Sequence, residues 1–372
     1  MRFSADVFAV EDTTVQLTWR GAPAGPVAIT VRDERSTRTL EVVGESGPGA
    51  LIVDELEADT EYRISIAPKG TDPSRPRKIR TLPTLPGAEL TRLSTISDIH
   101  IGESGFGVFP RSAEVPEPAV PHTLRCALAA IDEWTQWGSQ HVVFKGDLVD
   151  HGTRAEWETL AKLLARVPQP WTLILGNHET MNRAREKAED MLAELGLPAD
   201  PVRTTDLPGL RIVHVETAVD NRGHGRVRDV AAAADAVGES DLPCLVVIHH
   251  HIQRLPLPMF WPPGIESKSG KQFVRELRRA NPRIMLISGH SHRHRKHLVD
   301  GIPLVEVGSV KDYPGVWAGY VVHESGVRQV ARRVSPLDCL QWTDKTRSVM
   351  LGAWQFFSPG SLAARCFVHR WV

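Results

Sequence analysis

The sequence has few cysteines and no surplus of charge of either sign. Its four cysteines lie far apart and include no Cys-x-x-Cys pair, which excludes a disulfide-dense scaffold and makes a reducing cytoplasm the expected location. The 44 Lys and Arg residues face 45 Asp and Glu residues, which leaves a formal net charge of −1. No overall field therefore attracts nucleic acid or an anionic membrane.

Long hydrophobic runs are absent as well. No apolar stretch approaches the roughly 20 residues that span a bilayer. The N-terminal MRFSADVFAVEDTTVQLTW carries an early acid and lacks the continuous apolar core of a secretory signal. At about 150 residues per domain, the length predicts two domains or slightly more. Histidine, in contrast, is plentiful: there are 16, and several crowd into two short clusters.

Residues 1–85 are predicted to form a small all-β sandwich. Apolar and polar residues alternate in TVQLTW (14–19), VAITV (27–31) and EYRISIA (61–67), and turn-forming residues separate these runs. The stretch LEADTEY resembles the tyrosine-corner region of fibronectin type III domains, with Ala58 where proline is usual. TLPTLPG (81–87) indicates a linker, because its prolines restrict the backbone. A contact with a protein partner is the role expected of such a domain.

From residue 91 the pattern changes to alternating strands and helices. Short β-branched runs such as LSTIS, HVVFK and LVVI alternate with segments whose apolar residues recur at helical spacing, as in 121–137 and 153–167. This alternation predicts a layered α/β fold with largely buried sheets over residues 91–335. The aromatic-rich tail, residues 336–372, is expected to pack on that domain.

Five polar clusters directly follow five of the apolar runs. They are Asp98-Ile99-His100 after LSTIS, Gly146-Asp147 with Asp150 after HVVFK, Gly176-Asn177-His178-Glu179 after WTLIL, His249-His250-His251 after LVVI, and Gly289-His290-Ser291-His292 after RIMLIS. In an α/β sheet, residues beyond the carboxyl ends of the strands gather along one edge. The carboxylates, the amide and the imidazoles are therefore predicted to face a single site.

The residue types and their spacing favour a metal site. In Asp98-x-His100 and His290-x-His292, side chains i and i+2 of an extended segment point the same way. Carboxylate oxygen with imidazole nitrogen suits Zn, Mn or Fe better than Ca or Mg. The candidate ligands are too many for one tetrahedral ion, so two ions that share a bridging carboxylate are expected. The glycines that precede three of the clusters are expected to let the chain turn sharply there.

In their order, the motifs resemble those of the calcineurin-like metallophosphoesterase superfamily. DxH, GDxxD, GNHE, a histidine after an apolar strand and GHxH follow one another within residues 91–335. The resemblance implies a four-layer α/β/β/α sandwich in which two mixed sheets pack face to face. A β-sandwich before the catalytic domain is also a feature of purple acid phosphatases. Asp150, however, stands where those enzymes have an iron-binding tyrosine, so the closer resemblance is to the cyclic-nucleotide-phosphodiesterase-like branch.

The resemblance also implies roles for individual residues. The ligands of the first ion would be Asp98, His100, Asp147 and His292. Those of the second would be Asp147 (bridging), Asn177, His249 and His290. His178 would approach the scissile phosphate and assist the leaving oxygen. The catalytic residues are thus His178 and Asp147, and the cofactors are two Mn, Fe or Zn ions.

The implied activity is the hydrolysis of a phosphomonoester or small phosphodiester by a metal-bridging hydroxide. The expected partner is a small phosphorylated substrate, without a membrane and without nucleic acid. A nuclease is the alternative within the same chemistry, and the neutral charge argues against it. A non-catalytic binding scaffold would have lost ligands, whereas every motif position is filled here.

Some assignments stay open in the sequence. His249 is favoured as the metal ligand because it lies nearest the strand, with His250 as its rival. Asp150 is expected to orient a neighbouring side chain. Two long loops, 102–120 and 253–270, are expected to set the specificity.

The candidate substrate contacts also have simpler explanations. Phe260 and Trp261 either stack on a substrate or pack their loop. The segment with Arg222, His224 and Arg226 either contacts phosphate or forms an exposed turn. The basic run SHRHRKH (291–297) is either a phosphate-attracting rim or a solvated surface.

Overall fold

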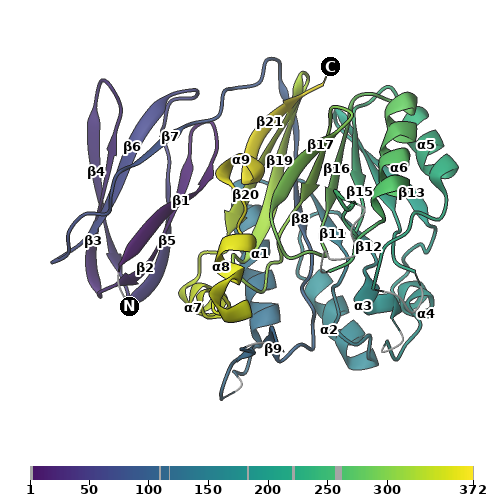
Figure 1. Cartoon of the computed structure of the whole chain (residues 1–372), viewed down its shortest axis with the longest axis horizontal. Helices are drawn as coiled ribbons and strands as arrows, with labels where there is room; N and C mark the ends of the chain where they lie inside the picture. Colours follow the sequence, from purple (N-terminus) through teal and green to yellow (C-terminus); the bar gives the residue numbers. More distant parts are fainter. Residues whose placement is uncertain are drawn as a thin grey trace.

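A small β-sandwich stands beside a larger α/β body (Figure 1). A computed structural model of the chain describes residues 3–108, 110–116, 118–181, 184–219, 223–255 and 262–371. Arg222, Phe260 and Trp261, three of the candidate substrate contacts, lie outside these ranges.

The N-terminal sandwich has a three-stranded sheet of order β1-β2-β5 and a four-stranded sheet of order β4-β3-β6-β7. Its strands are β1 (Ser4–Val10), β2 (Val15–Ala22), β3 (Gly25–Arg32), β4 (Thr37–Gly44), β5 (Gly47–Val53), β6 (Glu61–Pro68) and β7 (Arg77–Arg80). Alternate residues, among them Leu17, Ile29 and Ile64, form the core between the sheets. The hydroxyl of Tyr62 accepts a hydrogen bond from the backbone N–H of Glu57 (2.9 Å), which fixes the turn before β6.

The α/β body contains two mixed six-stranded sheets. The first has the order β12-β11-β8-β19-β20-β21 and the second β13-β14-β15-β16-β18-β17. The first is built from β8 (Glu89–Ile96), β11 (His141–Lys145), β12 (Trp171–Ile174), β19 (Val316–His323), β20 (Gly326–Arg333) and β21 (Cys366–Arg370). The second is built from β13 (Val202–Leu207), β14 (Leu210–Val215), β15 (Cys244–Val247), β16 (Ile284–Ser288), β17 (Arg295–Val299) and β18 (Ile302–Glu306). A short hairpin, β9 (Gly105–Phe106) with β10 (Ser112–Ala113), lies apart from both.

The two sheets pack face to face, as the alternation of core residues along β15 demonstrates. Leu245 and Val247 join the core that the first sheet also lines, whereas Cys244 and Val246 face the opposite side, where α5 and α6 pack. Both faces of this strand are buried, which explains its continuous apolar sequence. All four cysteines of the chain are free and buried, as the sequence predicts.

Helices complete the outer layers. They are α1 (His122–Trp137), α2 (Arg154–Leu164), α3 (Asn177–Thr180), α4 (Ala188–Glu194), α5 (Val230–Gly238), α6 (Ser267–Ala280), α7 (Leu337–Thr346), α8 (Trp354–Phe357) and α9 (Leu362–Arg365), with a 3-10 turn η1 (Met350–Gly352). Helix α1 packs on β19, and α5 packs on β13 and β14. The order is therefore the expected α/β/β/α. Within the described ranges, the helices are too short or too polar to cross a bilayer.

The sandwich and the α/β body share a polar, buried interface. Glu11, at the end of β1, pairs with Arg332 of β20 and accepts a hydrogen bond from Nε1 of Trp137 (3.3 Å). The side chain of Gln16 exchanges two hydrogen bonds with the backbone of Arg333 (2.7 and 2.8 Å). Phe8 belongs to the main core of the α/β body. Strand β1 is therefore built into both parts of the molecule.

The C-terminal segment does more than pack on the α/β body. Its β21 pairs with β20 and forms an edge of the first sheet. The guanidinium of Arg365 donates to the carbonyl of Phe8 (2.8 Å), and the backbone N–H of Val10 donates to Sγ of Cys366 (3.3 Å). The segment thus joins the sandwich to the sheet.

His214, on β14, predicts an acid-sensitive step in stability. Burial and the nearby Arg203 lower its pKa from 6.5 to about 3. Below pH 6.5, His214 binds a proton in the unfolded chain but stays neutral in the folded chain. The stability that His214 contributes is therefore fully present above pH 6.5 and is lost as the pH falls below that value. Below pH 6.5 we expect the free energy of unfolding to fall more steeply in the parent than in His214→Asn, by a difference that approaches about 1.4 kcal/mol per pH unit near pH 5. Urea unfolding at several pH values measures this, and parallel curves would contradict it.

Candidate metal centre and active site

The five polar clusters meet at the carboxyl ends of strands from both of the face-to-face sheets. β8, β11 and β12 are parallel neighbours in the first sheet, and β15 and β16 are parallel neighbours in the second. Their carboxyl ends therefore point to a common region. The structure brings all seven predicted ligands together there.

One group consists of Asp98, His100 and His292. One possible ligand atom from each lies within 4.8 Å of the others. Nε2 of His292 is 3.5 Å from a carboxylate oxygen of Asp98. The backbone N–H of His290 donates to both carboxylate oxygens of Asp98 (3.0 and 3.1 Å), which holds the end of β16 against the end of β8.

Asp147 lies at the centre of the cluster. Its Oδ2 is 3.2 Å from Nε2 of His249 and 3.7 Å from Nε2 of His100. Asp147 thus forms possible metal-binding groups with Asp98 and His249 on one side and with His100 and His178 on the other. This is the position that a bridging ligand requires.

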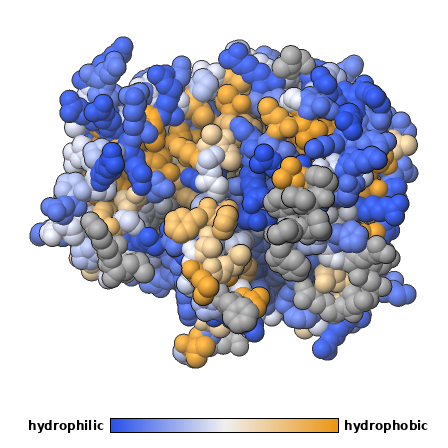
Figure 2. Space-filling view, in the orientation of Figure 1, coloured by the Kyte–Doolittle hydropathy of each residue, from blue (hydrophilic) through white to orange (hydrophobic). Residues whose placement is uncertain are grey.

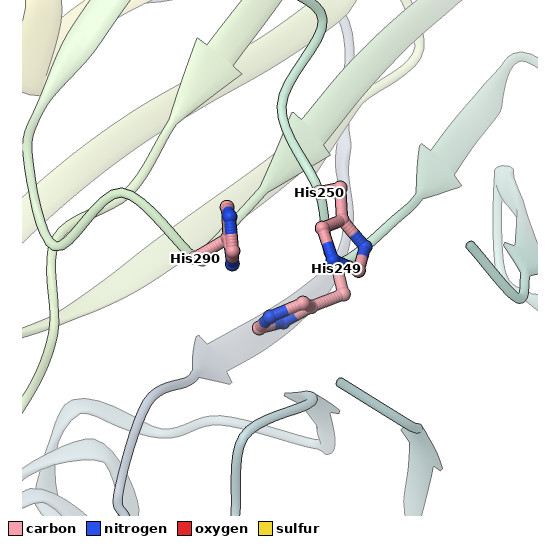
Figure 3. Close-up of side chains that lie close together, drawn as sticks. All are labelled: His249, His250 and His290. Atoms are coloured by element: carbon pink, nitrogen blue, oxygen red, sulfur yellow. The ribbon is translucent and has the colours of Figure 1, made fainter. Parts of the chain in front are cut away.

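His249 faces Asp147 and Asn177. Its Nδ1–H donates to the carbonyl of Lys145 (2.7 Å), which leaves Nε2 directed at the site. Oδ1 of Asn177 lies 3.3 Å from that Nε2. His290 completes this side, with its ring 5.1 Å from the ring of His249 (Figure 3).

The sequence left His249 and His250 as rivals, and the two have different surroundings. Nδ1 of His250 pairs with the hydroxyl of Thr217 (3.0 Å), and its ring lies 4.4 Å from that of His290. Figure 3 shows His250 beside the pair that His249 and His290 form. His249 is therefore the one in contact with Asp147, whereas His250 borders His290.

His178 is held by Asp150. Its Nδ1–H donates to the carboxylate and to the backbone carbonyl of Asp150, both at 3.0 Å. The opposite nitrogen, Nε2, lies 4.0 Å from Asp147, and the ring is partly exposed. Asp150 thus orients a neighbour, and His178 presents an imidazole nitrogen at the opening of the site.

The backbone of the ligands differs from the expected extended form. Asp98, His100, Asp147, His290 and His292 all have positive φ, between 51° and 65°. Side-chain alternation along an extended strand is therefore the wrong reason for their convergence. Such conformations cost about 1 kcal/mol or more each outside glycine, and they concentrate at functional sites.

Two of the three glycines have a different role from the predicted one, whereas Gly146 turns the chain as predicted. Among those before the clusters, Gly146 has a positive φ, of 82°, but Gly176 and Gly289 do not. A Cβ at Gly176 would lie 2.2 Å from Oδ1 of Asp147, and one at Gly289 would lie 2.8 Å from Oδ2 of Asp98. These two glycines make room for carboxylates.

Glu179, the last residue of GNHE, fixes the turn that carries Asp147. It accepts hydrogen bonds from the backbone N–H groups of four residues (2.6–3.0 Å): Asp147, Leu148, Val149 and Gly176. The motif contains this residue, but the sequence analysis gave it no role. Its position explains why a buried acid follows His178.

Two residues of the site were missed from the sequence. Asp312 is buried, and its carboxylate lies 2.6 Å from Nδ1 of His292, so it fixes that ring with Nε2 toward Asp98. Lys311 is also buried and pairs with Glu103 and Asp312. Three residues separate Lys311 from the apolar run IPLVEV, and four separate Asp312 from it, so the pattern of a strand directly followed by polar residues gave no signal for them.

The charges of the cluster attract cations. Burial disfavours the imidazolium of His249, but the carboxylates of Asp147 and Asp98 outweigh burial and raise its pKa to about 9. For Asp147, burial acts in the direction of a higher pKa. The imidazoles of His249 and His178 outweigh burial and hold the pKa of Asp147 well below its ordinary value. Two buried carboxylates thus depend on nearby positive charge.

Buried ring nitrogens that have no hydrogen-bond partner also indicate a metal site. Among the described residues, neither ring nitrogen of His100 has a hydrogen-bond partner, and Nε2 of His250 has none. Burial and the neighbouring His178 hold the pKa of His100 well below its usual range, so this ring is neutral and able to ligate. Buried polar atoms normally have partners, and a transition-metal ion would supply one. The residues present therefore fit a metal centre.

The loops around the site settle some of the open assignments. The run 291–297 is mixed: His294 is buried and its backbone N–H donates to the carbonyl of Ser358 (2.8 Å), whereas Lys296 is exposed. In the loop 102–120, Phe106 stacks on the ring of His292 at 5.7 Å. A Cβ at Gly225 would touch the ring of His250, which places the exposed His224 and Arg226 beside the site.

Comparison with known proteins agrees with this geometry. Residues 92–294 match the family model described as calcineurin-like phosphoesterase. A probable cyclic nucleotide phosphodiesterase of Synechococcus is 23% identical over 212 residues, which cover 56% of this chain and 74% of that protein. A cAMP/cGMP dual specificity phosphodiesterase of Mycobacterium tuberculosis is 28% identical over 178 residues, which cover 46% of this chain and 54% of that protein.

A solved structure supports the fold. The purple acid phosphatase of yellow lupin (Lupinus luteus) seeds has a TM-score of 0.51 at 13% identity, over 89% of this chain and 72% of that chain. The family match covers more than half of the sequence, and the metal-binding groups lie on the matched strands and loops. The chain therefore belongs to the calcineurin-like phosphoesterase family and is a metal-dependent phosphoesterase.

Proposed function

We propose that the protein uses two transition-metal ions, Mn, Fe or Zn, to hydrolyse a phosphomonoester or a small phosphodiester. The observation that carries this proposal is the position of Asp147 between two groups of ligands. Bound ions supply a Lewis acid for the phosphoryl oxygens and a nucleophile at neutral pH.

The ions would divide the seven side chains. One set is Asp98, His100, Asp147 and His292, and the other is Asp147, Asn177, His249 and His290. Asp312 supports the first set because it orients His292. The carbonyl of Lys145 supports the second because it fixes the tautomer of His249. Imidazole rings that are held by such hydrogen bonds need no rearrangement when a metal ion binds.

His178 acts on the leaving group in this proposal. Asp150 accepts from its Nδ1–H, so a second proton, present in the imidazolium form, is carried on Nε2 at the open side of the cluster. A positioned imidazole that donates this proton to the departing oxygen contributes about 10²–10⁴-fold to the rate. The carboxylate of Asp150 stabilises the charged form of the ring and keeps it in this orientation.

Small phosphodiesters are the first substrates to test. The named relatives are cyclic nucleotide phosphodiesterases, and the exposed side chains beside the site, the guanidinium of Arg226 and the imidazole of His224, can donate hydrogen bonds to a phosphate group. The neutral net charge argues against a polynucleotide, for which binding would weaken steeply with salt.

Metal analysis with an activity screen tests the proposal. We expect about two equivalents of transition metal per chain, loss of activity with chelator, and recovery with Mn, Zn or Fe. The screen covers cyclic nucleotides, nitrophenyl mono- and diesters, and a single-stranded oligonucleotide at low and high salt. A reconstituted protein that holds no metal, or one metal-loaded but inert toward every phosphoester, would overturn the proposal.

A further inference from the structure

Large apolar side chains gather on one exposed ridge beside the metal centre. We define the apolar ridge as Val108, Met350, Leu351, Phe356 and Phe357. Leu351 is 90% exposed, Phe356 77% and Val108 76%. Figure 2 shows hydrophobic atoms over α8 and again below it, at the loop that carries β9. Isolated apolar residues are common on surfaces, but a contiguous group of this size indicates a contact.

The two segments of the ridge lie together. A Cβ at Gly107 would lie 2.5 Å from the side chain of Val349, and Nζ of Lys345 donates to the carbonyl of Ala113 (2.5 Å). The connection continues to the active site, because Phe106 contacts both Trp354 of α8 (ring distance 5.5 Å) and His292 (5.7 Å). The ridge therefore stands at the rim of the metal centre.

The backbone projects the ridge outward. Met350 and Leu351 both have positive φ, 54° and 55°, a conformation that bulky side chains seldom adopt. Side chains that are about nine-tenths exposed stand on a convex surface, since a groove would shield them. A convex apolar edge does not enclose a small ligand, but it can enter a fluid hydrocarbon layer.

The charges beside the ridge are positive. Arg111 and Lys345 are exposed, and neither forms an ion pair within the described part of the chain. Two acids in the described part of these segments form ion pairs: Asp344 with Arg333 and Arg347, and Glu114 with Arg125. Arg111 donates to the hydroxyl of Ser104 (2.9 Å) and Lys345 to the carbonyl of Ala113, so each keeps an exposed positive charge with only neutral partners. Apolar side chains next to exposed cations are typical of proteins that bind anionic lipid surfaces.

We propose that the apolar ridge docks the protein on an anionic lipid bilayer, with Arg111 and Lys345 at the headgroups and Leu351 and Phe356 among the acyl chains. A second copy of the chain fits less well, because a two-fold contact through this patch would bring its cations together. The net charge of −1 averages over the whole chain and conceals this local arrangement. The docking would hold the metal centre at the membrane surface.

Vesicle flotation with the full-length protein tests the docking. We expect binding to phosphatidylcholine–phosphatidylglycerol vesicles, weaker binding to phosphatidylcholine alone, and a decrease with salt. The variant Leu351→Asn/Phe356→Ser should bind about tenfold or more weakly, because two large apolar groups are lost. Arg111→Gln/Lys345→Gln should lose about fivefold per charge.

Matched controls are available on other faces of the molecule. Val43, in the sandwich, is 84% exposed, and Leu298, on β17, is 64% exposed. Val43→Ser/Leu298→Ser should bind vesicles like the parent. Circular dichroism and hydrolysis of a soluble nitrophenyl ester should be unchanged in Leu351→Asn/Phe356→Ser and in Val43→Ser/Leu298→Ser, which separates docking from folding and catalysis.

Three results would overturn the proposal. The parent protein could fail to bind anionic vesicles at low salt, or the ridge and control variants could bind equally. The third result has two parts. The parent forms a concentration-dependent dimer in sedimentation, which Leu351→Asn/Phe356→Ser disrupts, and the parent does not bind vesicles. That outcome would assign the ridge to a second copy of the chain.

Discussion

Replacing Asp147 with asparagine is expected to reduce phosphoesterase activity to background while the fold is retained. The carboxylate is buried, and its Oδ2 lies 3.2 Å from His249 and 3.7 Å from His100. Asparagine keeps the volume but removes the charge that both groups of ligands share. Outer partners of a metal ligand are worth about 10–100-fold in metal affinity, and a shared ligand should exceed this. Metal content is expected to fall from two equivalents to one or none.

A matched control for this variant is Glu133→Gln. Glu133 is a half-buried acid of α1 that accepts hydrogen bonds from Trp317 (2.8 Å) and Ser335 (2.6 Å) rather than from a predicted metal ligand. Its replacement should leave the metal content unchanged. Turnover near that of the parent in Asp147→Asn, with two metals bound, would reject the bridging position.

Replacing His178 with glutamine is expected to lower kcat by about 10²–10⁴-fold with two metals still bound. The effect should depend on the leaving group. A nitrophenolate departs without a proton, so a nitrophenyl ester should lose much less than an alkyl phosphate. Comparison of kcat for the two substrates, together with metal analysis, separates a proton donor from a metal ligand.

Asp150→Asn refines the assignment of His178. It weakens the hydrogen bond that holds Nδ1 but leaves the ring in place, so a smaller loss with the same dependence on the leaving group is expected. Equal losses with both substrates would contradict a role in protonating the leaving oxygen. Loss of metal from His178→Gln would instead make this residue a ligand.

The sequence was sufficient to predict which side chains converge, because its signals are local. Each ligand directly follows an apolar strand, and parallel strands bring their carboxyl ends to one edge, as Asp98, Asp147 and Asn177 demonstrate. The preference for His249 over His250 as the ligand also rested on a local rule, its distance from the strand.

Contacts between distant segments could not be predicted in this way. Asp312 reaches His292 from the loop after β18, and Glu11 meets Arg332 across 321 positions of the chain. No periodicity encodes such pairs, because they depend on how whole sheets are placed. The left-handed backbone of the ligands was missed for a related reason: the turn is imposed by hydrogen bonds between strand ends, such as that from His100 to Asp147 (3.0 Å).

The buried pairs between strand β1 and strand β20 have a consequence for how the protein can vary. Glu11 with Arg332, and Asp12 with Arg328, would each leave a buried charge alone if one member changed. Related chains that keep the sandwich should therefore alter these positions two at a time. Those that lack it should carry uncharged residues where Arg328 and Arg332 stand.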